Sequence, residues 1–412
     1  MISPQKAGLL VHCMSSQSSL NTGRSTCIAG VIAEYNPFHD GHSYHLTQTR
    51  KAGADYIVVV MSTCFMQRGD LSIIPVKDRV RMALEGGADA VFALPVPWAL
   101  RDAEHFAMGG VSLLSGLGCN CISFGSETQE LPLLQQIADL LENPPDAMLQ
   151  VLHTRLNEGC SYPSAVAYAA ESIVPEASSV LSKSNNTLAI CYLRQLRRQK
   201  SQMVPICIPR DSCYLDTQIH DHQYASASAV RSAIRRGDWQ AIEKAIPESS
   251  LAILRRCALE GHIMHAGSLD SAILCSLRSL TDADWNDLED QTEGLPDRVR
   301  NALKTAASVD DLIMLSCTRR YTRARVTRLV LHTFLHMRAQ SLPSFGPEKA
   351  LLLGVRNESA DLLHKLGPMK ILGKASDLNE DWCMTEKRAW DLWAVGCGMP
   401  MGSLMTHGIV RV

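Results

Sequence analysis

The strongest constraint on the fold is an alternation of short apolar runs with longer polar segments over the first third of the chain. The apolar runs with the character of buried strands are Cys27–Ala33, Tyr56–Met61, Ala88–Pro95 and Cys121–Glu127. The segments between them with helical character are Ser43–Lys51, Lys77–Glu85 and Ala103–Ser115. Strands that alternate with helices form parallel sheets with helices on their faces. The sequence therefore predicts an α/β fold built on a parallel sheet.

The alternation continues to about residue 240, and the character of the chain then changes. Val204–Pro209 is a further predicted strand, and Ala227–Arg236 is a further predicted helix. After Glu243 strand signals nearly vanish, and helical periods dominate in Leu251–Glu260, Val299–Ala306, Tyr321–Arg338 and Thr385–Val395. The predicted units are a flexible, Ser-rich lead-in over residues 1–26, an α/β domain over 27–240 and a mostly helical C-terminal domain over 241–412.

Composition excludes several classes of protein. The formal net charge is −2, so a nucleic-acid partner must be held by a local basic patch. No apolar run approaches the roughly 20 residues needed to span a membrane, and we expect no membrane partner. The 14 cysteines are scattered from Cys13 to Cys397 without a CxxC pair, which favours free thiols in a reducing cytoplasm. Structural zinc is not expected, nor is any other metal site built from side chains.

The loop after the first predicted strand carries the chemistry. His39-Asp-Gly-His42 places two imidazoles three residues apart, and Gly41 lets the backbone approach a ligand closely. If a helix begins at His42, its free N–H groups and positive dipole end favour an anion. Imidazolium and backbone donors suit phosphate charge that grows in a transition state. Two alternatives are a helix-start histidine pair without a ligand and a metal site, which needs further ligands.

These residues resemble a family signature. The stretch GVIAEYNPFHDGHSYHL (Gly30–Leu46) is similar to the signature of the HxGH nucleotidyltransferase superfamily in its tRNA(Met) cytidine acetate ligase branch. Further motifs follow in the order of that family: MSTCFMQRGDLSII (Met61–Ile74), RVRMALEGGADAVFALP (Arg79–Pro95), FGSE (Phe124–Glu127), SNNTLAICYL (Ser184–Leu193), IPRDSCYLD (Ile208–Asp216), SASAVR (Ser226–Arg231) and RRYTRARVTR (Arg319–Arg328). The resemblance covers about residues 29–375. It implies a Rossmann-like nucleotidyltransferase domain followed by a mostly helical C-terminal domain.

The resemblance implies an ATP-dependent ligase that acts on elongator tRNA(Met) in the cytoplasm. Acetate attacks the α-phosphate of ATP, which is expected to carry Mg²⁺, and acetyl-adenylate and pyrophosphate form. The exocyclic amine of the wobble cytidine then takes the acetyl group. A carboxylate needs no base to attack phosphorus, so the protein must supply positioning and charge stabilisation.

The resemblance also implies the residues of the site. His39 and His42 are the implied catalytic residues, which stabilise the phosphate charge, and Ser226, Ser228 and Arg231 resemble a second phosphate-binding motif at a helix start. The implied ATP-binding residues are Ile32, Ala33, Glu34, Tyr35, Asn36, Pro37, Phe38, His39, Asp40, Gly41, His42, Ser43, Tyr44, His45, Gly125, Asn186, Arg210, Ser226, Ser228 and Arg231.

Some positions depart from the family pattern. The family has Ser-Gly-Asn where this chain has Ser62-Thr63-Cys64, and a Glu where this chain has Asp70. A Lys is expected three residues before Arg79, where Val76 stands. The departures at Thr63, Cys64 and Val76 bear on the acyl or tRNA pocket.

An arginine-rich segment predicts contact with nucleic acid. Five arginines fall within the ten residues Arg319–Arg328, which lead into an amphipathic helix. Such a stripe is usually a solvated face, but this density favours phosphate contacts. The segment Cys191–Lys200 is a second, weaker basic candidate, and His332 with His336 is better explained as core or surface histidines than as a metal pair. The predicted tRNA-binding residues are Arg319, Arg320, Arg325 and Arg328.

Two other classes of function remain open from the sequence. An adenylyl- or cytidylyltransferase acting on a small phosphorylated substrate shares HxGH and the Ser/Arg motif, but it needs neither the helical part nor its arginines. An RNA-binding module with an inactive nucleotide site is the other alternative. The intact His39, His42 and Arg231 argue against it.

Overall fold

The computed structural model describes residues 26–412 except 211–218, 220–223, 292–293, 379–381 and 404–405. The lead-in predicted over residues 1–26 therefore lies outside the described residues, apart from Thr26. None of the helices in the described part combines the length and the apolar character needed to cross a membrane.

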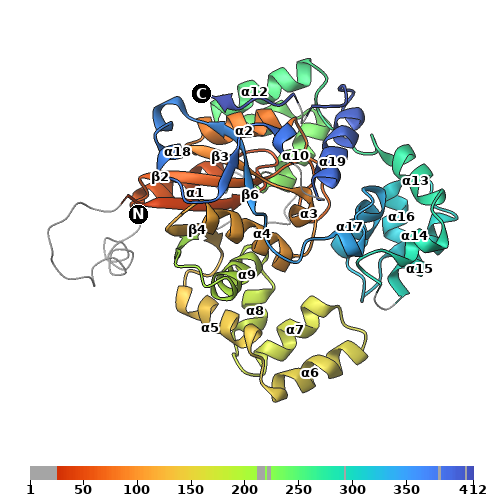
Figure 1. Cartoon of the computed structure of the whole chain (residues 1–412). Coiled ribbons are helices and arrows are strands. Elements are labelled where there is room, and N and C mark those ends of the chain that lie inside the picture. Colours follow the sequence, from red (N-terminus) through yellow and green to blue (C-terminus); the bar gives the residue numbers. More distant parts are fainter. Residues whose placement is uncertain (1–25, 211–218, 220–223, 292–293, 379–381, 404–405) are drawn as a thin grey trace.

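A mostly parallel sheet forms the centre of the described chain (Figure 1). Its strands are β1 (Ile28–Ala33), β2 (Tyr56–Ser62), β3 (Ala90–Leu94), β4 (Cys121–Ser126), β5 (Val204–Pro209), β6 (Lys349–Val355), β7 (Lys370–Leu372) and β8 (Val410–Arg411). The order is β5-β4-β1-β2-β3-β6-β7, and β8 also pairs with β6. All pairs are parallel except β3 with β6. The carboxyl ends of β1, β2 and β4 therefore meet at one edge, where ligands bind in open α/β sheets.

Side chains of β2 show why the central strands are continuous apolar runs. Ile57 and Val59 belong to one buried cluster, while Val58 and Val60 belong to a second. Successive side chains of a strand point to opposite faces, so both faces of the sheet are covered. The helices of the first half are α1 (Asp40–Lys51), α2 (Val76–Glu85), α3 (Val96–Ala99), α4 (Ala103–Gly116), α5 (Leu131–Glu142), α6 (Asp146–Asn157), α7 (Tyr162–Glu171), α8 (Ala177–Leu181), α9 (Ser184–Arg198) and α10 (Ala227–Arg236).

The second half of the chain is helical up to Phe334 and then returns to the sheet. Its helices are α11 (Trp239–Glu243), α12 (Glu248–Leu259), α13 (Asp270–Arg278), α14 (Asp282–Asn286), α15 (Leu295–Leu303), α16 (Val309–Ser316), α17 (Arg323–Phe334), η3 (Ala339–Ser341), η4 (Asn357–Ser359), α18 (Leu362–Lys365), η5 (Ala375–Asp377) and α19 (Cys383–Gly396). Helices α13 to α17 lie together at one side of the sheet (Figure 1).

The strands expected from the sequence are confirmed, but the expectation that strands nearly vanish after Glu243 was wrong. Residues 349–411 supply β6, β7 and β8, and β6 extends the sheet beyond β3. The run Ala350–Val355 is apolar and buried in the sheet. A short apolar run has no period that distinguishes a strand from a helix, so the sequence did not identify this strand. The boundary near residue 240 stays a prediction.

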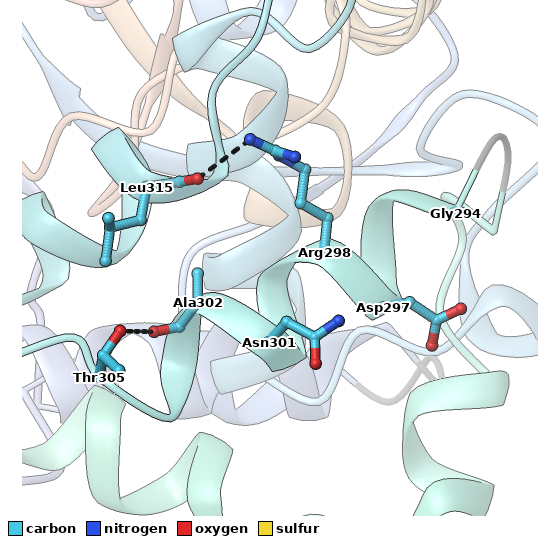
Figure 2. Close-up of a pocket in the computed structure, with 7 residues that line it drawn as sticks. All are labelled: Gly294, Asp297, Arg298, Asn301, Ala302, Thr305 and Leu315. Carbon is cyan, nitrogen blue, oxygen red and sulfur yellow. Dashed lines mark hydrogen bonds between the residues drawn. The ribbon is translucent and has the colours of Figure 1, made fainter.

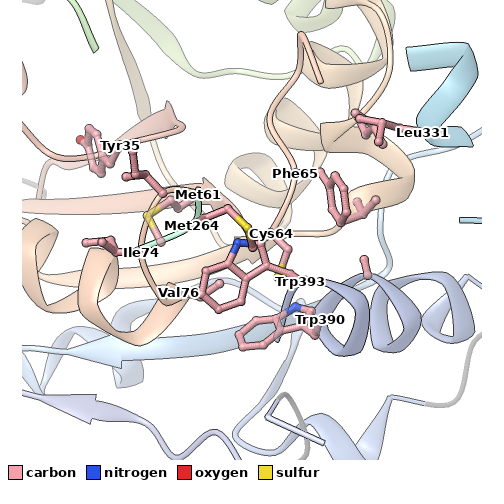
Figure 3. Close-up of a cluster of buried hydrophobic side chains, with 14 of the residues drawn as sticks. Tyr35, Met61, Cys64, Phe65, Ile74, Val76, Met264, Leu331, Trp390 and Trp393 are labelled. Carbon is pink, nitrogen blue, oxygen red and sulfur yellow. The ribbon is translucent and has the colours of Figure 1, made fainter. Parts of the chain in front are cut away.

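One buried cluster joins the candidate site to the end of the chain (Figure 3). Tyr35 follows β1, Met61 lies near the end of β2, and the indoles of Trp390 and Trp393 come from α19. Trp393 Nε1 donates to Ser72 O at 2.7 Å, so the C-terminal helix also binds the loop after β2.

Glu386 of α19 is buried within this contact. Its carboxylate accepts from Thr63 Oγ1 at 2.7 Å, from Val96 N at 2.5 Å and from Trp390 Nε1 at 2.8 Å. Burial raises the pKa of Glu386, and these three donors act in the opposite direction.

We expect Glu386→Ala to lower the free energy of unfolding by about 3 kcal/mol, because it leaves three buried donors without an acceptor. Chemical denaturation by urea measures this loss. The matched control is Glu358→Ala, whose carboxylate is largely exposed beside Arg356 and should contribute less than about 0.5 kcal/mol. Equal stabilities of the two variants would contradict the role of α19 as an anchor of the loop after β2.

Candidate active site

The loop that follows β1 is fixed in place by the polar side chains of two residues. Asn36 Nδ2 donates to Leu71 O at 2.9 Å, and Asn36 Oδ1 accepts from Ile73 N at 2.8 Å. The guanidinium of Arg79, fully buried on α2, donates to Glu34 O and to the carbonyl oxygens of Ser62 and Thr63. Arg79 therefore ties the end of β1 to the end of β2.

The backbone of this loop is strained at Tyr35. Its φ is +44°, a left-handed conformation that costs a non-glycine residue about 1 kcal/mol or more. The ring is buried between Phe38 and His42, with centroid distances of 4.9 and 4.7 Å. This packing holds the loop in the conformation that brings the histidines together.

His39 and His42 form a reciprocal cap at the start of α1. His39 Nδ1 accepts from Gly41 N at 3.1 Å, and His42 Nδ1 accepts from His39 N at 3.2 Å. Their rings stack with a centroid distance of 3.6 Å. Because both Nδ1 atoms accept hydrogen bonds, both imidazoles carry their proton on Nε2. His39 Nε2 is buried and has no hydrogen-bond partner among the described residues, as expected of a donor that awaits a ligand.

Two details of the expected anion site were wrong. The helix begins at Asp40 rather than His42, and its first N–H groups already have acceptors: Asp40 N donates to Ala245 O at 3.0 Å. Burial also lowers the pKa of both His39 and His42, and the nearby cation Arg210 acts in the same direction. In the protein alone the pair is therefore neutral, with hydrogen on each Nε2 atom.

The second phosphate motif lies against the same loop. Ser226 caps α10 by accepting from Ala229 N at 3.0 Å, and Arg231 on the next turn is buried. Arg231 donates to Asn36 O at 2.9 Å, to Asp70 Oδ2 at 2.7 Å and to Ser228 Oγ at 3.3 Å. The two motifs, distant in sequence, are thus brought into direct contact.

Two predicted residues meet at the carboxyl end of β4. A Cβ on Gly125 would lie 3.3 Å from Cδ of Arg210, so glycine leaves room for that side chain. Arg210 also donates to Asn185 Oδ1 at 3.4 Å, and its charge acts on the buried imidazoles of His39, His42 and His45.

Asn186 is buried and uses its whole side-chain amide within the protein. Oδ1 accepts from Ser126 Oγ and Thr128 N at 2.7 and 3.0 Å, while Nδ2 donates to Thr128 Oγ1 and Val180 O at 2.9 and 3.1 Å. Asn186 therefore positions the loop after β4, and its amide has no donor left for ATP.

Other predicted residues of the loop line the site through packing. His45 Nε2 bonds with Ser123 Oγ at 2.9 Å, and burial lowers the pKa of this imidazole to about 3. The ring of Tyr44 lies 5.2 Å from that of Tyr224. Ile32 faces Gly110 and Phe38 faces Gly86, so these two side chains are core.

The arginine-rich segment is not the exposed stripe that the sequence indicated. Arg325 is paired with Asp290, at 2.7 and 2.8 Å, and Arg328 is half-buried and reaches Gln67 O at 3.5 Å. Arg320 donates to Leu156 O at 3.2 Å, whereas Arg319 is exposed. The polar face of α17 thus packs toward the loop after β2.

The remaining basic and histidine candidates have structural roles. In the second basic helix, Arg194, Arg197 and Arg198 pair with carboxylates of α4 and α5. His332 is buried with Nε2 on Leu100 O, which confirms a core histidine. Among the residues that the structure describes, no three His, Cys, Asp or Glu side chains gather as metal ligands.

A separate hollow of about 430 Å³ lies on α15 and α16 (Figure 2). Arg298 borders it and donates to Ser316 O at 2.8 Å and to Leu315 O at 3.3 Å. None of the residues predicted for the site lines this hollow. Its lining consists of Gly294, Asp297, Arg298, Asn301, Ala302, Thr305 and Leu315.

Residues 27–394 match the sequence model of the HIGH nucleotidyl transferase family. The chain is 34% identical to the tRNA(Met) cytidine acetate ligase of Acetivibrio thermocellus, over 82% of this chain and 85% of that protein. It is 35% identical to the tRNA(Met) cytidine acetate ligase of Caldanaerobacter subterraneus, with the same coverage.

Two solved structures of a protein from the same family resemble this chain. The apo crystal structure of Thermotoga maritima TmcAL matches with a TM-score of 0.87 and 27% identity, over 94% of this chain and 100% of that chain. A crystal structure of the same protein bound with alpha-thio ATP matches with a TM-score of 0.84. The chain therefore belongs to the HIGH nucleotidyltransferase family, in its tRNA(Met) cytidine acetate ligase branch.

Proposed function

We propose that this chain is an ATP-dependent ligase that activates acetate as acetyl-adenylate and transfers the acetyl group to the wobble cytidine of elongator tRNA(Met), in the cytoplasm. The observation that carries the proposal is the reciprocal cap of His39 and His42, which uses both Nδ1 atoms and leaves the hydrogen on each Nε2 atom. Two relatives with the same named activity and a neighbour that binds an ATP analogue support it.

In the first step the oxygen of acetate attacks the α-phosphorus of ATP, and the bond to pyrophosphate breaks. His39 and His42 stabilise the growing phosphate charge by donating from Nε2, while Arg210 and Arg231 add positive charge beside the loop. Preorganised donors of this kind act without reorganisation during the reaction.

The triphosphate is proposed to lie along residues 32–45, with its leaving group toward Ser226, Ser228 and Arg231. Mg²⁺ would enter on the phosphates, since it usually keeps several waters and binds few protein ligands. Its contribution would be to neutralise charge on the leaving pyrophosphate.

In the second step the exocyclic amine of cytidine attacks the acetyl carbon, and AMP leaves. We propose that Arg319, Arg320, Arg325 and Arg328 contact tRNA phosphates beside this site. The half-buried Arg328 touches the loop after β2, so RNA held here lies next to the adenylate.

We predict that His42→Ala reduces acetyl-adenylate formation about 10²–10³-fold, because one preorganised donor is lost. Pyrophosphate release from ATP and acetate measures this rate. His42→Asn is the matched variant, because its side-chain oxygen retains the cap on His39 N but it lacks the Nε2 donor. We expect Asn to restore stability and not activity; recovery of activity by Asn would remove His42 Nε2 from the mechanism.

The ligase proposal predicts the fate of each atom group. Labelled acetate must appear on the cytidine of the RNA, and the adenylyl group must leave as AMP, because an acyl-adenylate is consumed in the second step. Chromatography of the digested tRNA and of the nucleotides checks both. An adenylyl group stably joined to a product would instead support an adenylyl- or cytidylyltransferase.

Arg319→Ala combined with Arg328→Ala is expected to weaken tRNA binding and to flatten its salt dependence by a slope of about one for each lost phosphate contact. Adenylate formation without RNA should change little. Arg323→Ala is the control on the same helix, since this exposed arginine is paired with Asp310. The measurement is the affinity for tRNA at a series of salt concentrations. If the double variant kept the wild-type salt slope, these arginines would have a structural role and would not contact tRNA phosphates.

A further inference from the structure

Glu34 stands between β1 and the histidine loop with one carboxylate oxygen unused. Oε1 accepts from Gln67 N at 2.7 Å, and the backbone carbonyl is held by Arg79. Oε2 makes no hydrogen bond with any residue that the structure describes, and Glu34 as a whole residue is partly exposed. The carboxylate is thus fixed by one oxygen and open to a ligand by the other.

The pKa of Glu34 is raised overall by opposing effects of its surroundings. Burial raises the pKa of its carboxyl group, the hydrogen bond from Gln67 N lowers it, and the charge of Asp70 raises it further. Asp70 Oδ2 lies 2.7 Å from the guanidinium of Arg231, and this positive charge limits the effect of Asp70 on the pKa of Glu34. The titratable and charged groups that face Glu34 are Arg68 and Asp70 after β2, Arg79 on α2, Tyr192 on α9 and Arg231 on α10.

The second step of the proposed reaction needs a proton acceptor. The exocyclic amine of cytidine gains positive charge as it attacks the acetyl carbon, and a proton must leave its nitrogen. His39 and His42 cannot accept it while their Nδ1 atoms accept backbone N–H groups and their Nε2 atoms carry hydrogen. His45 Nε2 is engaged with Ser123, and Asp70 is paired with Arg231.

We propose that Glu34 is the general base of acetyl transfer, an inference that rests on the proposed function. The cytidine nitrogen bonds to the acetyl carbon, the bond from that carbon to the phosphate oxygen breaks, and its electron pair leaves with AMP. The proton from the amine passes to Glu34 Oε2 and from there to water. Glu34 is then a catalytic residue of the second step rather than only a part of the nucleotide loop.

We predict that Glu34→Gln slows acetyl transfer about 10²-fold or more, within the usual contribution of a positioned base. The amide oxygen still accepts from Gln67 N, so the loop is retained. Transfer is measured in a single turnover from enzyme-bound acetyl-adenylate to tRNA, and adenylate formation is measured by exchange of pyrophosphate into ATP. The second rate should fall far less than the first.

The pH dependence supplies a readout that a structural role would not move. Because only the ionised carboxylate accepts a proton, wild-type transfer should rise with pH through the pKa of Glu34 and then level off. This rise should occur above the ordinary pKa of a glutamate, about 4.3, and should be lost in Glu34→Gln. Asp70→Asn should move the rise to lower pH, since it removes a negative neighbour, and retain the transfer itself.

Glu85→Gln is the matched carboxylate control outside the site, since Glu85 is paired with Arg81 on α2, and it should change neither rate. Equal losses of both rates in Glu34→Gln, or a pH rise that persists in it, would overturn the assignment. If wild-type protein moved no acetate to tRNA, the proposed function itself would fail. That result is distinguishable from failure of the Glu34 assignment, because it is obtained with the wild-type protein alone.

Discussion

The site depends on one buried cation at the carboxyl ends of β1 and β2. Arg79 is fully buried, and burial lowers the pKa of its guanidinium to about 10, which still leaves it charged at neutral pH. It donates to Glu34 O just after β1 and to Ser62 O and Thr63 O at the end of β2, so it satisfies carbonyl groups where the two parallel strands end. Because those carbonyls are fixed, Glu34 and the loop after β2 start from fixed positions. Asn36 and Arg231 then close the loop from the far side.

Charge is distributed unevenly around this frame. The positive charge of Arg210 acts on both neutral imidazoles, and that of Arg231 acts on His39. A bound triphosphate would place negative charge beside these cations, and the neutral imidazoles would donate to it from Nε2.

The sequence was sufficient for β1 to β5 and for the histidine loop, and insufficient for β6 to β8 and for the partners of that loop. Strand β2 is a run of β-branched residues, and α10 has the bounds that its Ser226 cap predicts. Arg79 and Glu386 carried no such signal, since each looks like an ordinary charge in a helix until its surroundings are known. The ion pair of Arg325 on α17 could not be predicted for the same reason: its partner Asp290 lies 35 residues away in sequence, and no local pattern connects them.

The departures from the family pattern are explained by the anchor that the C-terminal helix provides. Thr63 donates to Glu386 through its hydroxyl group, an interaction that the glycine usual at this position cannot make. Cys64 is fully buried beside Trp393, and burial raises the pKa of its thiol (Figure 3). Val76, which stands where a lysine is usual, is buried at the start of α2. These three positions therefore belong to the shared core, so their substitutions alter packing behind the loop rather than the surface that faces acetate or RNA.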